Sequence, residues 1–433
     1  MKSVLTVRDE SGLVRHGTLL MIGTLVGAVC NAAFHMVVGR EQVLSNAEYG
    51  SLVAMLGIIL AVSTPMLALQ NTLAHFISTR ERAGRRDEIL PFFLHWAMVF
   101  TVVSAVIVLG AWLFRAPLAA FWNVRPVLMV TTLVVLAGSL WMNLFYGLLQ
   151  GMQAFGWLAW APQAWGLTRL VLGAAFTLGI SATATAALAA QGIGVAVVLL
   201  LGVGALLSLH LPKGSAVRRP PGSYRYLGSA LLCLGGYAML MNLDAALAKR
   251  YFDAETAGLF AKAAIIARTA VFLPVPIATA LFPKVSSVGD LSHDSWRLLG
   301  KALAYAGLLI GAAVGVCLVW PALPWTILYG TWSPEIADSA ATMTRAMVLA
   351  MAPLALAYLL LNFEMAQRQF RQSFVLVPAG LAYVAGVALL HTHPLQIPAV
   401  LGALNLAVLL WLVRAVLRRR ASPVRSGREQ PET

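Results

Sequence analysis

Charged residues are scarce in this chain of 433 residues. Asp, Glu, Lys and Arg together make up 11% of it, while hydrophobic residues make up 60%, and the mean hydropathy is +0.80. A soluble globular domain carries about 25% charged residues, so that class is excluded. Apolar runs of about 20 residues recur from end to end, each long enough to cross a bilayer core of ~30 Å. Because lipid offers no partner to free backbone groups, these runs predict an all-α polytopic membrane protein.

Cysteines, nucleotide-binding motifs and long loops are also few or absent. The three cysteines, Cys30, Cys233 and Cys317, all fall within apolar runs, which gives neither a disulfide framework nor a metal-ligand spacing. We therefore expect no metal site and no cofactor. The sequence has no G-x-x-x-x-G-K-[ST] motif, so any transport must draw on an ion gradient or on the substrate's own gradient. No loop exceeds about twenty residues, which leaves no room for an extramembrane catalytic domain and predicts that the protein is not an enzyme.

Acidic residues are outnumbered by basic ones, 17 against 31, for a net charge of +14. The basic residues lie in short loops between apolar runs, which favours membrane topology over nucleic-acid binding. If the N-terminus is cytoplasmic, most Lys and Arg fall in cytoplasmic segments. The outer segments then hold only Arg40, Arg115, Arg125, Lys249 and Arg250. The positive-inside rule thus predicts a multi-pass protein of the cell (inner) membrane with both termini in the cytoplasm.

The apolar runs predict twelve spans in two groups of six. Their approximate limits are 17–39, 50–77, 90–114, 127–149, 157–180 and 185–209, then 226–248, 257–282, 299–320, 339–362, 374–390 and 397–417. The stretch LPKGSAVRRPPGSYRY separates the groups and is rich in Pro, Gly and Arg, as a linker is. We predict an N-terminal lobe (1–210), a cytoplasmic linker (211–225), a C-terminal lobe (226–417) and a disordered basic tail (418–433).

An internal repeat supports two related lobes. The turn AEYG at 47–50 matches ETAG at 255–258, and each is followed by an apolar run broken by proline. Setting Gly50 on Gly258 brings Ser78 onto Ser286 without a gap. Duplicated halves of this kind are typical of secondary transporters.

Three ionisable residues within the predicted spans are the main candidates for a site: Asp244, Lys262 and Arg268. A charge in the bilayer usually faces a cavity or a partner. The two cations form a lining for an anionic substrate, or else Asp244 neutralises one of them in a structural ion pair. Six residues apart on a helix, the cations do not share one face. Arg40 and Lys249 complete the predicted substrate-binding set.

Prolines and three further polar residues have weaker interpretations. Pro65, Pro274 and Pro276 each remove a helical hydrogen bond inside a span, which predicts either a hinge or a fixed kink. Arg169 reaches a cavity or bonds to a neighbouring helix. His35 and His75 either titrate in transport or, as lone histidines near span ends, are plain polar contacts.

The sequence resembles a known family over nearly its whole length. NAEYGSLVAMLGIILAVSTPMLALQNTLAHFIS is similar to the second-span region of polysaccharide flippases, and NLDAALAKRYFDAETAGLFAKAAIIAR to their seventh and eighth spans. LFYGLLQGMQAFGWLAWAPQAWGLTRLVLG resembles their fourth-to-fifth connection. These are the Wzx-type oligosaccharide flippases of the multidrug/oligosaccharidyl-lipid/polysaccharide (MOP) exporter superfamily.

The resemblance implies a V-shaped, MATE-like pair of six-helix lobes that alternates between two orientations. It implies a polyprenyl-pyrophosphate-linked oligosaccharide as substrate, moved to the outer leaflet for cell-surface polysaccharide biosynthesis. Lys262 and Arg268 match the span that holds the family's cavity cations, and Asp244 matches an acid common in the seventh span. Membrane lipid, glycan polymerase or assembly proteins and a coupling cation (Na⁺ or H⁺) are the implied partners.

Other functions remain as alternatives. A drug/cation antiporter of the same superfamily is expected to line its cavity with carboxylates, and the spans hold only Asp244 and Glu364. A lipid II flippase is disfavoured because the arginine cluster of spans one and two is missing, with only Arg40 nearby. A glycan polymerase or ligase needs an outer loop with an acid–base pair, which is not evident here.

Overall fold

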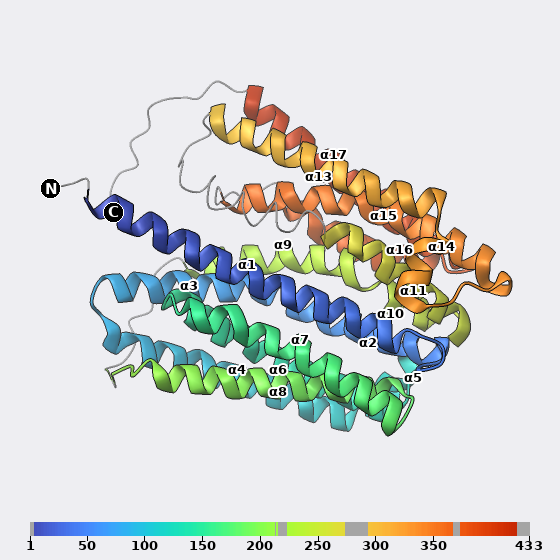
Figure 1. Cartoon of the computed structure of the whole chain (residues 1–433), viewed down its shortest axis with the longest axis horizontal. Helices are drawn as coiled ribbons and strands as arrows, with labels where there is room; N and C mark the ends of the chain where they lie inside the picture. Colours follow the sequence, from blue (N-terminus) through green and yellow to red (C-terminus); the bar gives the residue numbers. More distant parts are fainter. Residues whose placement is uncertain (1–3, 213, 215–222, 273–292, 367–372, 422–433) are drawn as a thin grey trace.

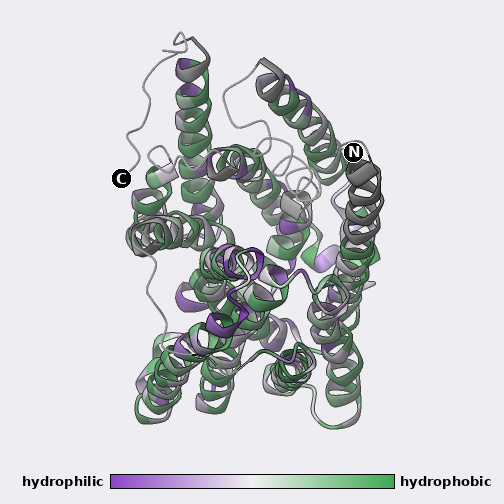
Figure 2. Cartoon of the chain, turned by 90° about the vertical axis from the view of Figure 1, so that its left-hand side faces the viewer, coloured by the Kyte–Doolittle hydropathy of each residue, from purple (hydrophilic) through white to green (hydrophobic). Residues whose placement is uncertain are grey.

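The structure, a computed structural model, describes residues 4–212, 214, 223–272, 293–366 and 373–421. Within them the regular elements are all helices, as the hydropathy predicts. Hydrophobic residues predominate along the long helices (Figure 2). On α4, for example, Met98, Leu109 and Trp112 are more than half exposed. Such side chains suit contact with lipid rather than water.

The first half of the chain forms one bundle, here called the N-bundle. Its helices are α1 (Val4–Val38), α2 (Asn46–Ser63), α3 (Met66–Arg82), α4 (Ile89–Leu113), α5 (Arg115–Phe121), α6 (Pro126–Gly151), α7 (Phe155–Gly179) and α8 (Ala184–Ser208). α7 packs between α1 and α8, and α6 contacts α3, α4 and α8. A short 3₁₀ turn, Arg86–Glu88, leads into α4.

The second half forms the C-bundle. Its helices are α9 (Ser223–Asn242), α10 (Asp244–Tyr251), α11 (Ala254–Phe272), α13 (His293–Val319), α14 (Ala322–Tyr329), α15 (Pro334–Ala366), α16 (Leu376–Leu389) and α17 (Gln396–Ala421). α15 lies against α11, α13 and α17, while α16 contacts α9 and α17. The predicted lobe boundaries stay predictions, because most of the linker lies outside the described residues.

The sequence repeat extends over the helices of both bundles. Gly50 and Gly258 are 208 positions apart, the difference between 258 and 50. The same offset relates the first residues of α2 and α11, Asn46 and Ala254, and those of α6 and α15, Pro126 and Pro334. When 208 is added to the residue numbers of α5, the first residue falls one position after the start of α14 and the last residue falls on the end of α14. The two bundles are therefore two copies of one helical plan.

Eight described helical segments are long and apolar enough to cross a membrane, and the bent pair α9–α10 makes a ninth. The count of twelve spans stays a prediction. Two differences from the sequence interpretation are plain. The loops after α4 and α13 contain the short helices α5 and α14, and the predicted span at 226–248 is not straight, since α9 and α10 meet at 53°.

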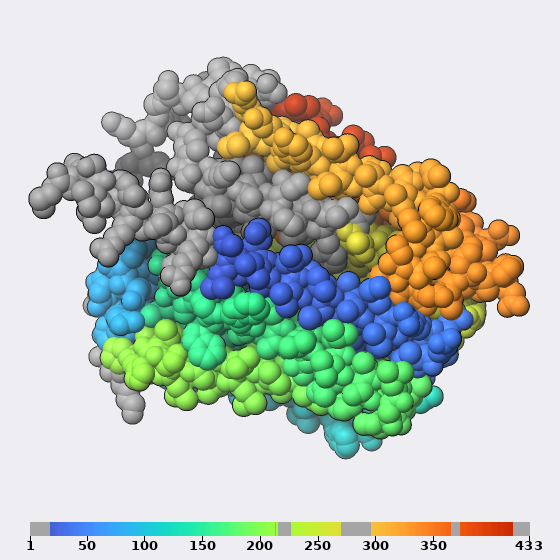
Figure 3. Space-filling view, viewed as in Figure 1, coloured from blue at the N-terminus to red at the C-terminus, as the bar shows by residue number. Residues whose placement is uncertain are grey.

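The two bundles meet along α2 and at one end of the molecule. α2 contacts α9, α10 and α11, and α1 contacts α14. We call the end that holds the start of α1 the near end, and the opposite end, with α5, α10 and α14, the far end (Figure 1). On the face shown in Figure 3, the blue surface of α1 meets the orange surface of α14 at the far end.

Candidate functional site

Arg268 and Asp244 form a buried ion pair at the break between α9 and α10. Arg268 donates from Nη2 to Asp244 Oδ1, and Asp244 is fully buried. The guanidinium also donates from Nε to the Met241 carbonyl at 3.2 Å. The helix break leaves carbonyls such as this one without their intrahelical donors, and Arg268 supplies the replacement. The sequence allowed either Lys262 or Arg268 as the partner of Asp244, and in the structure the partner is Arg268. This arginine therefore stabilises the bend.

The second carboxylate oxygen of Asp244, Oδ2, has no hydrogen-bond partner among the described residues. A buried carboxylate oxygen usually accepts at least one hydrogen bond. Asp244 therefore retains acceptor capacity beyond its pairing with Arg268. No group of three or more His, Cys, Asp or Glu residues in the described part of the chain is arranged to hold a metal ion.

Lys262 joins the two bundles through a second ion pair. Its Nζ lies 3.2 Å from Glu41 Oε1, on the loop between α1 and α2, and its side chain is fully buried. Asn46 of α2 donates both to Glu41 and to Glu255 of α11. Lys262 also lies 5.3 Å from the ring centroid of Tyr329, a cation–π distance. Lys262 and Arg268 thus contact different neighbours, as their spacing on α11 predicts.

A directional chain of hydrogen bonds crosses from one bundle to the other. Arg169 of α7 donates to His35 Nε2 at 3.1 Å, and His35 Nδ1 lies 3.0 Å from the Tyr49 hydroxyl. Tyr49 pairs with Tyr329 of α14, whose hydroxyl donates to the Lys262 carbonyl at 3.0 Å. A guanidinium only donates, so Nε2 is the acceptor, and the proton of a neutral ring sits on Nδ1 and faces Tyr49. The chain therefore assigns a neutral His35.

Arg169 is a buried cation that has no carboxylate partner among the described residues. It is 3% exposed, and no described carboxylate lies within ion-pairing distance of it. Its Nε has no hydrogen-bond partner within the described ranges. Its guanidinium lies over the rings of Phe34, at 3.8 Å, and Trp165, at 5.3 Å. Aromatic faces attract a cation but supply less stabilisation than a counter-charge.

The remaining predicted residues lie apart from this cluster. Arg40 is exposed at the far end, beside Gly330. Lys249, on α10, is buried and lines a pocket that is separate from this cluster. Pro65 lies between the end of α2 and the start of α3, so it does interrupt the helical hydrogen bonding, and its role as a hinge stays a prediction. Pro274 and Pro276 lie outside the described residues.

Sequence reasoning missed most of the residues that link the bundles: Glu41, Asn46, Tyr49, Glu255 and Tyr329. Tyrosine and tryptophan near span ends are usually interfacial, and nothing in their spacing distinguishes these buried ones. The repeat offers one signal, since AEYG contains Tyr49 beside Gly50 and ETAG begins with Glu255.

Two helical bundles of one plan, with buried cations along their contact and polar links across it, make up a fold that resembles solved structures of the multidrug/oligosaccharidyl-lipid/polysaccharide (MOP) superfamily. The fold matches an inward-facing MATE family multidrug resistance transporter of that superfamily with a TM-score of 0.72 over 92% of this chain and 96% of that one, at 14% identity. It matches the lipid II flippase MurJ in an inward closed conformation at 0.70, over 92% and 87%, also at 14% identity. An outward-facing MATE family structure gives 0.62 over 94% and 96%.

No protein-family model matches the sequence, and no curated protein matches it either. At 14% identity the structural likeness establishes the fold, and these neighbours are transporters rather than enzymes.

Proposed function

We propose that this protein is a flippase that moves a polyprenyl-pyrophosphate-linked oligosaccharide from the cytoplasmic to the outer leaflet of the cell membrane by alternating access. The observation that supports this most is the buried Arg169, which pairs with no carboxylate in the described part of the chain. Burying an unpaired charge is costly, and a protein retains one where it meets a counter-charge in another state.

The buried cations suit a pyrophosphate. Arg169, Lys262 and Arg268 lie on α7 and α11, helices of different bundles. Among the described residues their ion-pair partners are Glu41 and Asp244, and Glu255 lies near Lys262. A guanidinium offers paired donors that match phosphate oxygens. When the bundles separate, Glu41 leaves Lys262, and an anionic headgroup takes its place. The polyprenyl tail stays in lipid while the headgroup crosses.

The far end then corresponds to the outer surface in the closed state, and both termini lie in the cytoplasm. The five basic residues predicted to be outside all sit on far-end segments: Arg40, Arg115, Arg125, Lys249 and Arg250 (Figure 1). A coupling cation, Na⁺ or H⁺, supplies the driving force, and glycan polymerase or assembly proteins receive the product.

Proteoliposomes test the proposal. The protein is reconstituted with a polyprenyl-pyrophosphate oligosaccharide, and the fraction of glycan open to an external glycosidase is followed over time. We expect Arg169→Ala to lose at least nine-tenths of the flipping rate, whereas Arg414→Ala, which removes an exposed arginine on α17, keeps it. Equal rates for the two variants would refute a role for Arg169 in substrate binding.

A drug/cation antiporter is the second candidate, because Asp244 has an unpartnered carboxylate oxygen. It predicts uptake of a lipophilic cation into the same proteoliposomes, abolished by Asp244→Asn and unaffected by Arg169→Ala. The two variants thus separate the candidates in one preparation.

A further inference from the structure

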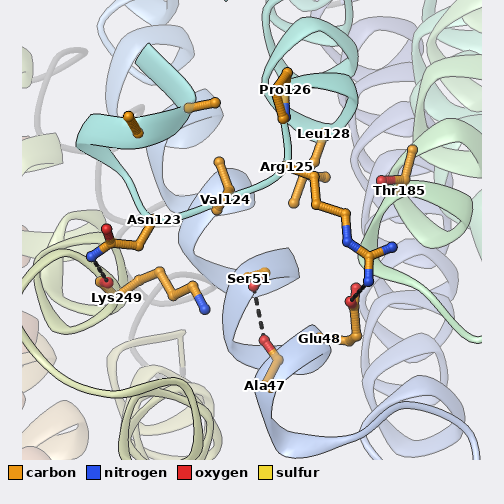
Figure 4. Close-up of a pocket in the computed structure, with 12 residues that line it drawn as sticks. Ala47, Glu48, Ser51, Asn123, Val124, Arg125, Pro126, Leu128, Thr185 and Lys249 are labelled. Carbon is orange, nitrogen blue, oxygen red and sulfur yellow. Dashed lines mark hydrogen bonds and ion pairs between the residues drawn. The ribbon is translucent and has the colours of Figure 1, made fainter. Parts of the chain in front are cut away.

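A pocket of about 480 Å³ opens at the far end, away from the buried cluster. It lies between the start of α2, the connection from α5 to α6 and the start of α8, all in the N-bundle, and Lys249 of α10 closes it from the C-bundle (Figure 4). Its polar lining residues are Glu48, Ser51, Asn123, Arg125, Thr185 and Lys249. The pocket is therefore shared between the two bundles.

Lys249 points its ammonium group into this pocket (Figure 4). The residue is only 6% exposed, and no hydrogen bond or ion pair to its Nζ occurs among the described residues. Its backbone is fixed, since its carbonyl accepts from Asn123 Nδ2 at 3.3 Å. A lysine this deeply buried is normally paired. Glu48 and Asp253 act electrostatically on Lys249, but neither forms an ion pair with its ammonium group, which faces the pocket without a direct partner among the described residues.

Glu48, the acidic residue among those that line the pocket, already has two partners. Its Oε1 lies 3.4 Å from Arg125 Nη2, and its Oε2 accepts from the Ala184 amide at 2.7 Å, at the start of α8. The direct partners of Glu48 thus lie on the N-bundle side of the pocket, and it acts on Lys249 only electrostatically, from beyond ion-pairing distance. The ammonium group remains available to a ligand.

A second feature of the pocket also favours an anion. α6 begins at Pro126 with no side-chain cap, and Leu128 in its first turn lines the pocket. The first amides of a helix lack intrahelical acceptors and carry a partial positive charge. An uncapped helix start facing a cavity is a favourable position for phosphate oxygens.

We propose that the pocket binds a small phosphate-bearing group, held between the Lys249 ammonium and the first turn of α6. The volume exceeds what one phosphate needs and leaves room for a glycerol or sugar unit. Ser51, Asn123 and Thr185 present hydroxyl and amide groups to hydroxyls on that unit. The site is distinct from the buried cations of the transport cluster, and it is independent of the transported substrate.

Occupancy of the site has a conformational consequence. Lys249 belongs to the C-bundle and every other lining residue to the N-bundle, so a bound phosphate bridges the two. Separation of the bundles at the far end removes Lys249 from the site. By linkage, a ligand that binds only the closed far end stabilises that state. The ligand therefore acts as an inhibitor of far-end opening.

The experiment uses the full chain in detergent micelles and in lipid nanodiscs. In micelles, glycerol 3-phosphate and inorganic phosphate are titrated against matched ionic strength of chloride, and thermal unfolding is recorded. We expect a saturable rise in melting temperature. In Lys249→Gln the half-maximal rise should require at least ten times more ligand, and in Lys249→Arg it should occur at the wild-type ligand concentration. Arg115→Gln, which removes an exposed charge from the same end, should bind as the wild type does.

The nanodisc arm identifies the source of the phosphate. If a lipid headgroup fills the site, phosphatidylglycerol discs should raise the melting temperature over phosphatidylcholine discs in a Lys249-dependent way, and added glycerol 3-phosphate should have no further effect. If a soluble ligand fills the site, the two kinds of disc should give the same melting temperature, and added glycerol 3-phosphate should raise it in a Lys249-dependent way. The proposal is overturned if neither arm responds, or if Lys249→Gln, folded at the wild-type melting temperature in chloride, responds as the wild type does.

Discussion

The backbones of Gly50 and Gly258, the two residues that the sequence repeat aligns, lie against each other where α2 crosses α11. A Cβ on Gly50 would lie 2.9 Å from the Gly258 Cα, closer than real Cβ contacts. A Cβ on Gly258 would clash with the Asn46 carbonyl. Equivalent residues of two copies meet in this way when a pseudo-two-fold axis passes between them. The glycines therefore set how closely the bundles approach.

The first prediction is that Gly258→Ala holds the far end apart. The new methyl group meets backbone atoms of α2, which cannot move aside as a flexible side chain does. Spin labels on Arg115→Cys and Glu335→Cys, exposed far-end positions on different bundles, report the separation. We expect a longer distance in Gly258→Ala. Gly311→Ala, whose Cβ has no neighbour within 4 Å, should leave the distance unchanged.

The helices and their duplication were predictable because hydropathy and the turn residues are local signals. The cross-bundle contacts were not. Glu41 and Lys262 are far apart in the sequence, and nothing local indicates that they pair. No proline marks the 53° bend between α9 and α10. The bend depends on Arg268 of α11, which donates a hydrogen bond to the Met241 carbonyl that the bend leaves free. The importance of Arg169 could not be predicted from the sequence. What distinguishes this residue is that no described carboxylate pairs with it, and that depends on which side chains the fold brings close.

The second prediction concerns pH and His35. In the closed far end, Nε2 accepts from Arg169, so a proton on that nitrogen would face a guanidinium at 3.1 Å. Protonation therefore destabilises the closed state, and closure weakens as pH falls. One titrating proton changes the closed-to-open ratio by at most about tenfold per pH unit. The same spin-label distance, recorded from pH 8 to pH 5, should lengthen on acidification.

The His35→Gln variant is the control for this dependence. Glutamine keeps one acceptor and one donor but does not titrate, so its distance should stay constant across the range. The other groups around His35 are Arg169, Tyr49 and Tyr329, none of which normally titrates between pH 5 and 8. An unaltered pH response in His35→Gln would assign the effect to another residue.

The third prediction is the membrane topology. Reporter fusions after Arg86, Arg219 and Arg420 should report the cytoplasm, and fusions near Pro117 and His393 the outside. Pro117 lies in α5 at the far end, and Arg86 lies in the turn between α3 and α4 at the near end. An outside signal at Arg219 would require an odd number of spans before the linker and would contradict two equivalent halves.

The last prediction separates the structural role of Arg268 from a role in transport. Arg268→Ala leaves Asp244 buried without its counter-charge, which costs about 3–5 kcal/mol for a buried pair. We expect a lower melting temperature in detergent, and partial recovery in the double variant Arg268→Met, Asp244→Leu, because well-packed apolar residues often replace a buried pair at little cost. If Arg268 also binds the pyrophosphate, the double variant stays inactive in the glycosidase assay despite its regained stability. A stable double variant that flips the glycan at the wild-type rate would confine Arg268 to stabilising the bend, and would leave Arg169 and Lys262 as the cations for the substrate.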